Sequence, residues 1–332
     1  MNESFYNLTA RPFASAPVVE RYFPGEAIET ARQTIKRNIE RGAGPSLLIG
    51  PAGTGKSHLC HVLASELADN LRIVMLASAR LCTRRALLKN ILFELELPYH
   101  DREEGELRLA LIDYLKRSDD CPHGAVMLVD EAHTMPLRLL EELRMITNLV
   151  HDGRPCVHLV LAGNSRLENR FADPQLESFS QRIAARCYLQ PLNSQETRQY
   201  VQSELAHVGG HATQLFADDA FTAIYQATGG IPRLINQVCD HALILGSLGG
   251  HTTLHARGID EAWADLQQLP MNWDEEETPP ASESAIIEFG PLDDEPHDEQ
   301  QVEDNAPVEV NDETTDDAVA DDILAGHIYA EV

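Results

Sequence analysis

GPAGTGKS, residues 50–57, is the stretch of sequence that decides the fold expected of this chain. It matches the pattern G-x-x-x-x-G-K-[ST] of a phosphate-binding loop without interruption. The short apolar run 46–49 precedes it, and residues 58–68 follow it with leucines and a valine at helical spacing. Because such a loop lies between a buried strand and a helix, both flanks support the motif.

The loop has the chemistry to hold a polyphosphate and a magnesium ion. Its glycines let backbone N–H groups turn inward, and the start of the next helix adds partial positive charge. The ammonium of Lys56 can reach the terminal phosphates, and the hydroxyl of Ser57 can ligate Mg2+. We therefore expect a bound nucleotide to contact Gly50, Pro51, Ala52, Gly53, Thr54, Gly55, Lys56, Ser57 and His58.

Strands and helices alternate along the first part of the chain. Apolar runs predict strands at 46–49, 73–76, 125–131, 157–162 and 185–189. Helical spacing of apolar residues predicts helices at 26–41, 58–68, 83–95, 103–117 and 137–150. Strands that are apolar along their whole length indicate a parallel sheet covered on both faces. We expect an α/β fold with a parallel five-stranded sheet sandwiched by helices.

From residue 193 the pattern contains helices only, at 194–207, 217–227, 232–246 and 258–269. With 332 residues, the chain is also too long for one compact domain of average size. We therefore divide it into an N-terminal linker at 1–25, a nucleotide-binding α/β domain at 26–191, a small all-α domain at 192–270 and a tail at 271–332.

Charge sets the tail apart from the rest of the chain. Residues 271–332 contain 21 Asp and Glu and no Lys or Arg. Of the formal net charge of −27, only −6 belongs to the first 270 residues. Repeated acidic residues without helical or alternating apolar spacing predict a disordered acidic tail. A solubilising role is expected for it, with short apolar docking motifs as the alternative.

The sequence indicates a cytoplasmic protein. It has no apolar stretch of about 18 residues, so no transmembrane span is expected. The first residues lack the basic-then-apolar order of a signal peptide. Six scattered cysteines without a CxxC pair are typical of buried, reduced thiols.

Polar residues follow two of the predicted strands, at the edge where ligands bind in open α/β sheets. Asp130 and Glu131 end the third strand, and Asn164 follows the fourth. We expect Asp130 to hold Mg2+ through its water shell and Glu131 to orient and deprotonate the attacking water. Asn164 is expected to hydrogen-bond that water or the γ-phosphate, with an ordinary turn residue as the alternative.

Residues 130–133 also spell DEAH, the letters of a helicase motif. A superfamily 2 helicase would need a second sheet domain of comparable size, and only about 80 helical residues follow position 189. The helicase interpretation is therefore not favoured. His133 is expected to contact the neighbouring nucleotide site or to face solvent.

Three arginines are candidates for stabilising negative charge on the γ-phosphate. Arg182 and Arg186 lie in the segment 180–186, and either could act as a finger at a subunit edge. Arg233 follows Pro232 at an expected helix start and could close the helical domain over the phosphates. Surface ion pairing is the alternative for each of them.

Taken in order, these motifs resemble those of AAA+ ATPases: a phosphate loop, an Asp-Glu pair, a strand-end Asn, an arginine finger and the G-x-P-R of a helical lid. More narrowly, the chain resembles the general secretion pathway protein A group, and the resemblance covers about residues 4–270. The shared phrases are FYNL and RPF within 5–13, LVDEAH at 128–133 (more often ending in Gln), LAGN at 161–164, QRI at 181–183 and GGIPRLINQVCDHAL at 229–243.

The resemblance implies an AAA+ core with a helical lid, ATP and Mg2+ as ligands, and ATP hydrolysis between the subunits of a homo-oligomeric ring or arc. It further implies assembly or remodelling of a protein complex in secretion- or pilus-type export. The best-known members continue after the ATPase with a membrane span and often a peptidoglycan-binding domain, where this chain has its acidic tail.

Two other functions stay open at this point. Related ATPases of transposition complexes share the core without the anchor, which makes an ATP-dependent DNA-binding regulator the alternative. The body of the chain is slightly acidic and has only four lysines, which favours protein partners over DNA. A switch that binds ATP and hardly hydrolyses it is the third reading, and the intact Glu131 argues against it.

Overall fold

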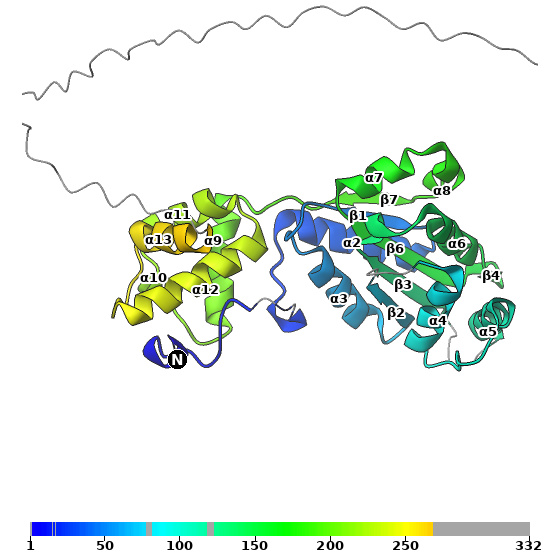
Figure 1. Cartoon of the computed structure of the whole chain (residues 1–332), viewed down its shortest axis with the longest axis horizontal. Helices are drawn as coiled ribbons and strands as arrows, with labels where there is room; N and C mark the ends of the chain where they lie inside the picture. Colours follow the sequence, from blue (N-terminus) through cyan, green and yellow to red (C-terminus); the bar gives the residue numbers. More distant parts are fainter. Residues whose placement is uncertain (1, 15, 17, 78–81, 118–122, 268–332) are drawn as a thin grey trace, which may run out of the picture. The chain divides into compact units, whose positions relative to one another are not determined.

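The computed structural model describes residues 2–14, 16, 18–77, 82–117 and 123–267 (Figure 1). The acidic tail predicted at 271–332 lies outside these ranges, as does Cys121. Within them, no helix is both long and apolar enough to cross a bilayer. Four of the five cysteines there are buried, but Cys82 is exposed, which corrects the expectation of buried thiols at that position.

The centre of the fold is a five-stranded sheet, and every neighbouring pair of its strands runs parallel. The order β2-β3-β6-β1-β7 is formed by β1 (Ser46–Ile49), β2 (Arg72–Ala77), β3 (Ala125–Asp130), β6 (Val157–Gly163) and β7 (Ala185–Tyr188). The predicted parallel sheet is therefore confirmed. Because the carboxyl ends of parallel strands share one edge, the residues that follow β1, β6 and β3 lie side by side.

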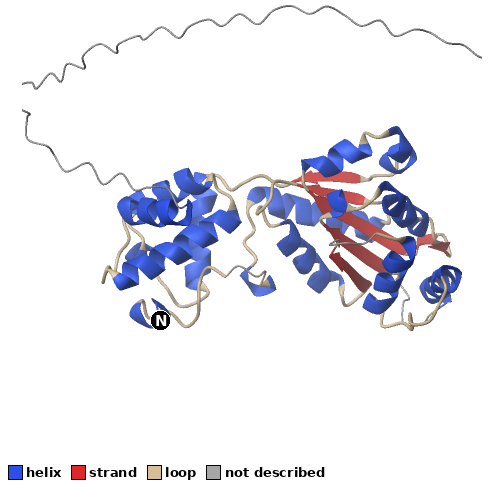
Figure 2. Cartoon of the chain, in the orientation of Figure 1, coloured by secondary structure: helices blue, strands red, loops and turns tan. Residues whose placement is uncertain are grey.

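Helices cover both faces of this sheet (Figure 2). One face packs against α2 (Glu26–Arg41) and α3 (Lys56–Leu67). The other packs against α4 (Arg84–Glu94), α5 (Glu104–Arg117), α6 (Leu137–Thr147), α7 (Ser165–Phe171) and α8 (Glu177–Ser180). Neighbouring side chains of a strand point to opposite faces, so Leu47 and Leu48 are buried in different apolar clusters. Burial on both faces explains why the strands are apolar throughout.

One predicted helix is too long. The helix expected at 137–150 ends at Thr147, and a short hairpin follows, formed by β4 (Val150–His151) and β5 (Arg154–Pro155). Its two loop residues, Asp152 and Gly153, have φ angles of 47° and 75°. A two-residue hairpin loop of this kind favours Asp-Gly, which was the local signal for the turn.

The helical region contains α9 (Ser194–Ala206), α10 (Ala212–Leu215), α11 (Asp218–Thr228), α12 (Pro232–Leu248) and α13 (Ala256–Gln267). Asn193 begins α9 with a capping box: its side chain accepts a hydrogen bond from the Glu196 N–H, and the Glu196 carboxylate accepts one from the Asn193 N–H. This region has an apolar core of its own, separate from the two clusters around the sheet.

The N-terminal segment, predicted as a linker, contributes to that helical core. It contains α1 (Asn2–Phe5) and the 3-10 turn η1 (Val19–Arg21), and Figure 1 shows its start beside α12. Phe13 is 1% exposed and meets Phe216 edge to face. Arg11 donates two hydrogen bonds, of 2.8 and 2.5 Å, to the carboxylate of Asp240.

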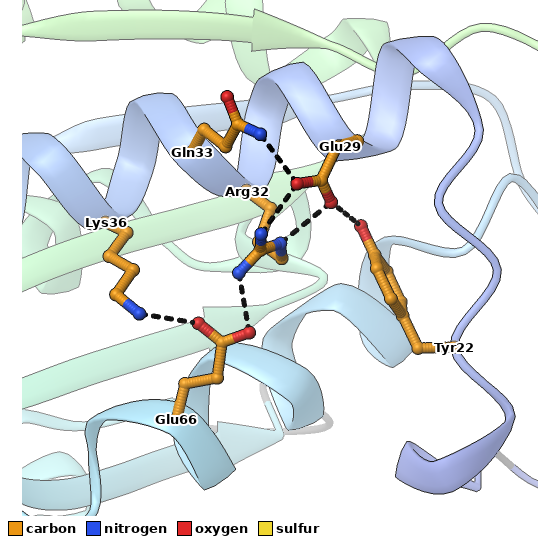
Figure 3. Close-up of polar contacts among 6 residues, drawn as sticks. All are labelled: Tyr22, Glu29, Arg32, Gln33, Lys36 and Glu66. Carbon is orange, nitrogen blue, oxygen red and sulfur yellow. Dashed lines mark hydrogen bonds and ion pairs between the residues drawn. The ribbon is translucent and has the colours of Figure 1, made fainter.

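A polar network joins the end of this segment to α2 and α3 (Figure 3). Tyr22 donates a 3.0 Å hydrogen bond to Glu29, which also accepts two from Arg32, of 2.8 and 2.6 Å. Arg32 and Lys36 both reach Glu66 on α3, at 2.7 and 3.1 Å. The Arg32 guanidinium is the main reason that the pKa of Glu29 is lowered to about 2. The segment is therefore fastened to the α/β core as well as to the helical region.

Gly230, just before α12, offers a test of this architecture. Its φ is +73°, and a Cβ there would lie 1.8 Å from the carbonyl oxygen of Leu192. We expect Gly230→Ala to lower the free energy of unfolding by clearly more than the about 1 to 2 kcal/mol of a left-handed residue alone, because the backbone must also move. Urea unfolding followed by circular dichroism measures the loss.

The matched control is Gly229→Ala. Gly229 also has a positive φ, of 57°, but nothing lies within 4 Å of a Cβ at that position. Only the conformational cost is expected for it. Equal losses in the two variants would contradict the close approach of Gly230 to Leu192.

Candidate nucleotide-binding site

The loop between β1 and α3 has the shape that its glycines predict. Gly53 and Gly55 adopt φ angles of 84° and 96°, which residues with a side chain rarely adopt. At Gly53 there is also no room for a Cβ, which would lie 2.9 Å from side-chain atoms of both Ile231 and Arg233. The loop is thus held between the start of α3 and the start of α12.

Lys56 is the first residue of α3, at the end of the loop, and is only 5% exposed. Its ammonium donates hydrogen bonds of 2.9 and 2.8 Å to the carbonyl oxygens of Gly50 and Pro51. Burial lowers the pKa of Lys56 from its ordinary value, while the negative charges of Glu131 and Asp130 act in the opposite direction. A buried ammonium facing a cavity is suited to an anionic ligand such as a phosphate.

Ser57 and Asp130, the two residues expected to hold Mg2+, lie together. The Ser57 hydroxyl donates a 2.5 Å hydrogen bond to Oδ2 of Asp130, and Oδ1 of Asp130 accepts one of 2.8 Å from the Glu131 N–H. A hydroxyl and a carboxylate are the hard oxygen ligands that Mg2+ prefers, and Mg2+ commonly keeps several waters beside such ligands. These two residues therefore fit a magnesium ion.

Glu131, His133 and Asn164 form a second group at the same edge of the sheet. Glu131 has a left-handed backbone, with φ 50°, and begins the short turn η2 (Ala132–Thr134). The ring atom Nε2 of His133 lies 3.0 Å from Nδ2 of Asn164 and 3.5 Å from Oε2 of Glu131. Of the two expectations for His133, exposure to solvent is wrong, because its side chain is only 11% exposed. Its contacts with Glu131 and Asn164 agree with the other, that it contacts the neighbouring nucleotide site.

A cavity of about 800 Å³ collects most of the predicted site residues. Its lining includes Ala52, Gly53, Gly55, Lys56, Ser57, His58, Asp130, Glu131 and Arg233. Four other predicted residues are not part of this lining but contact or adjoin residues that are: Gly50, Pro51, Thr54 and Asn164.

Arg233 approaches the phosphate loop from the helical region. It is the second residue of α12, after Pro232, and its backbone N–H donates a 3.3 Å hydrogen bond to the carbonyl oxygen of Gly53. Within the described part of the chain, no carboxylate pairs with its guanidinium. The surface ion pair weighed as the alternative for Arg233 is therefore not formed with a described residue.

Arg182 and Arg186 do not reach this cavity. The Arg182 guanidinium donates to Asn148, and Arg186 contacts Ser180 at 3.0 Å and Glu168 at 3.8 Å. Arg186 lies on β7, which is an edge strand of the sheet, and Arg182 lies in the turn between α8 and β7. An exposed arginine at a sheet edge is available to a second copy of the chain.

His58, a predicted nucleotide contact that lines the cavity, also contacts the N-terminal segment. Its Nε2 donates a 3.0 Å hydrogen bond to the carbonyl oxygen of Val18, and its ring meets Tyr22 edge to face. Burial lowers the pKa of His58 below its ordinary value. The side chain thus holds the N-terminal segment against α3 while its edge lines the cavity.

The motifs did not reveal the wall opposite the phosphate loop, which includes Arg21, Tyr200, Glu204 and Asn236. Tyr200 donates a 2.9 Å hydrogen bond to Asn236, and Arg21 lies 3.6 Å from the Glu204 carboxylate. Burial raises the pKa of Glu204 to about 7, although Arg21 opposes the shift. Of these residues, only Asn236 could have been singled out from the sequence, because it lies in the shared segment 229–243.

Comparison with known proteins assigns the region around the phosphate loop to a known domain family. Residues 39–171, which include the phosphate loop, Asp130, Glu131 and Asn164, match the AAA domain family. The chain carries an AAA domain. Over 258 residues it is also 34% identical to general secretion pathway protein A from Aeromonas hydrophila, an alignment that covers 77% of this chain and 47% of that protein. The resemblance to this group of AAA+ ATPases is therefore confirmed, and the chain spans about half the length of the relative.

Solved structures agree with the AAA domain assignment. Cdc6p from Pyrobaculum aerophilum matches with a TM-score of 0.60 at 16% identity, over 78% of this chain and 70% of that one. The Aeropyrum pernix ORC2 protein, in its ADPNP-ADP complexes, matches with a TM-score of 0.58 at 14% identity, over 79% and 72% of the two chains. At these identities the likeness shows the fold alone, and it confirms the predicted AAA+ fold of the AAA domain.

The pKa of Glu204 predicts how stability changes with pH. An unfolded glutamate titrates near pH 4.3, so between about pH 4.3 and pH 7 the folded AAA domain protein keeps a proton that the unfolded chain has lost. Its stability should therefore fall as pH rises through this window. Glu204→Gln stays neutral, and we expect its stability relative to wild type to be greater at pH 8 than at pH 5.

Urea unfolding at the two pH values measures this difference. Glu261→Gln, at a carboxylate that is 40% exposed, is the control and should show a much smaller change. An equal effect of Glu204→Gln at both pH values would mean that Arg21 keeps Glu204 ionised in the folded protein.

Proposed function

We propose that this chain binds ATP with Mg2+ and hydrolyses it to drive the assembly or remodelling of a protein complex. The observation that carries the proposal is the convergence of Lys56, Ser57, Asp130, Glu131 and Arg233 on one cavity of about 800 Å³. Two cations for the phosphates, two oxygen ligands for a metal and one free carboxylate are the groups that phosphoryl transfer to water requires.

The phosphate loop is the binding part of the proposed mechanism. Inward-facing N–H groups after Gly53 and Gly55 hold the phosphates, and Lys56 exchanges its two carbonyl partners for phosphate oxygens. Ser57 and Asp130 are the residues that would hold Mg2+. When bound, Mg2+ would neutralise part of the negative charge that builds up on the phosphate oxygens.

Glu131 is the proposed general base. Its carboxylate is 53% exposed and faces the cavity, where it can take a proton from an attacking water. Asn164 is proposed to hold that water or the γ-phosphate through its amide, and Arg233 to bind the γ-phosphate from the side of the helical region. Arg182 or Arg186 is proposed to act on the cavity of a neighbouring copy, as a finger in trans.

The partner is proposed from the relative. The Aeromonas hydrophila protein is named for the general secretion pathway, and the similarity includes 77% of this chain. We therefore propose components of a secretion or pilus system as the proteins on which ATP hydrolysis acts. Because the chain spans 47% of that relative, this part of the proposal concerns the shared ATPase region.

Two substitutions test the ATPase. Lys56→Ala removes the buried cation, so we expect it to lose ATP binding, measured with a fluorescent ATP analogue. Glu131→Gln keeps the shape but cannot accept a proton, so we expect it to bind ATP with Mg2+ and to hydrolyse it about 10² to 10⁴ times more slowly. Phosphate release measures the rate.

Lys36→Ala and Glu103→Gln are the controls, because neither residue lines the cavity. Both should bind and hydrolyse ATP at close to the wild-type rate. Normal turnover by Glu131→Gln would remove this residue from the mechanism. Binding without measurable turnover in the wild-type protein would favour the nucleotide switch.

Mixing of variants tests the finger in trans. We expect Arg182→Ala or Arg186→Ala, whichever is the finger, to lower turnover by roughly 10³-fold or more. Adding inactive Lys56→Ala subunits should then restore part of the activity, because they supply the missing arginine to an intact cavity. The rate of phosphate release is measured across mixing ratios.

Arg257→Ala, at an arginine that is 89% exposed, is the control and should hydrolyse ATP normally before and after mixing. Absence of any rescue, in mixtures shown by light scattering to contain both variants in one oligomer, would place the whole site within one chain.

A further inference from the structure

His133 stands between the proposed general base and the proposed phosphate sensor, and no motif assigned it a role there. One ring atom, Nε2, faces both Nδ2 of Asn164, at 3.0 Å, and Oε2 of Glu131, at 3.5 Å. Gly163, the last residue of β6, also lies against His133: a Cβ there would be 3.4 Å, an ordinary contact distance, from the His133 backbone nitrogen. The contact therefore depends on the end of β6 as well as on the turn after β3.

The orientation of Asn164 is fixed by the helix that it begins. Its Oδ1 accepts a 3.0 Å hydrogen bond from the Arg166 N–H at the start of α7. Its other side-chain atom, the donor Nδ2, is thereby directed at His133. An amide nitrogen only donates, so Nε2 must be the acceptor in this arrangement.

The two contacts of Nε2 exclude each other in a neutral ring. Neutral imidazole has one N–H and one bare nitrogen. To accept from Asn164, Nε2 must be bare and Nδ1 must carry the proton. To donate to Glu131, Nε2 must carry the proton. Nδ1 is buried without a hydrogen-bond partner among the described residues, so the groups that face Nε2 decide between the two forms.

We propose that His133 is a positioning residue that exchanges one hydrogen bond, from Asn164 to Glu131, when a γ-phosphate is bound. The proposal rests on the function proposed above. An anionic phosphate oxygen is a stronger acceptor than a neutral ring nitrogen, so it draws the Asn164 amide away from Nε2. The ring then changes its neutral form: Nε2 takes a proton from water, the buried Nδ1 loses one to solvent when the ring transiently turns outward, and the charge of the ring is unchanged.

In the second form, Nε2–H donates to Oε2 of Glu131. The Glu131 side chain is 53% exposed, so this bond restrains a carboxylate that otherwise has much freedom. The general base is thus held in position only while a γ-phosphate is present. Occupancy of the phosphate end of the site is in this way coupled to the readiness of the base.

The exchange is a property of histidine at this position. A glutamine carries a carbonyl oxygen and an NH2 group on one side chain, so it could accept from Asn164 and donate to Glu131 at the same time. His133→Gln is therefore expected to support catalysis without the exchange, whereas His133→Ala supports neither contact.

Nitrogen NMR of the full chain tests the exchange directly. With 15N-labelled histidine, long-range correlations report which ring nitrogen carries the proton, and comparison with His133→Gln assigns the His133 signal. We expect Nδ1–H without nucleotide and with Mg2+ and ADP, and Nε2–H with Mg2+ and a non-hydrolysable ATP analogue. The same form in all three states would overturn the proposal.

Kinetics tests the positioning role. For His133→Ala we expect kcat for ATP to fall about tenfold and KM to change by less than about twofold, because binding is kept while the base is misplaced. His133→Gln should recover most of the lost kcat. His151→Ala, on the exposed β4–β5 hairpin, is the control and should match wild type.

The outcomes separate this inference from the function on which it rests. A wild-type chain that does not hydrolyse ATP contradicts the proposed function. A wild-type chain that hydrolyses ATP, with His133→Ala equal to it in kcat or with His133→Gln as slow as His133→Ala, contradicts the positioning role of His133 alone.

Discussion

A buried ammonium is the constraint on which the nucleotide site depends. Lys56 is 5% exposed, and the two carbonyl oxygens that it contacts accept two of its three N–H groups but do not neutralise its charge. Burial disfavours the charged form of Lys56 and so lowers its pKa, and a nearby anionic ligand would offset this effect. The loop can bend around this side chain only because Gly53 and Gly55 take left-handed backbone angles. The core strand before the loop and the buried helix after it hold that bend in place.

The helical region is tied to the same loop through several segments that are distant in sequence. The Arg233 N–H contacts Gly53, and the N-terminal segment contacts both α3, through His58, and the helical core, through Phe13. The walls of the cavity come from five stretches of the chain: the N-terminal segment, the phosphate loop with the start of α3, the end of β3, α9 and the start of α12. A ligand that touches several of them would stabilise their arrangement, because binding adds its free energy to whichever arrangement it contacts.

The sequence was sufficient where the signal is local. Strands buried on both faces are apolar throughout, and the chemistry of Lys56 and Asp130 is visible in their motifs. It was insufficient where a contact depends on the backbone direction after an element. Glu131 takes a left-handed φ that few residues adopt, and this turn sends His133 back toward Asn164 rather than outward. Glu204 could not be found either, because its partner Arg21 is distant in sequence.

One continuous series of contacts crosses the carboxyl edge of the sheet. It runs from Ser57 to Asp130, on to the backbone of Glu131, through His133 to Asn164. These residues lie at or after the ends of β1, β3 and β6, so the register of the three strands helps to determine the distances in the series. A shift of one residue in any strand would turn its side chains to the opposite face. The apolar packing on both faces prevents that shift, and in this way the core of the fold sets the geometry of the site.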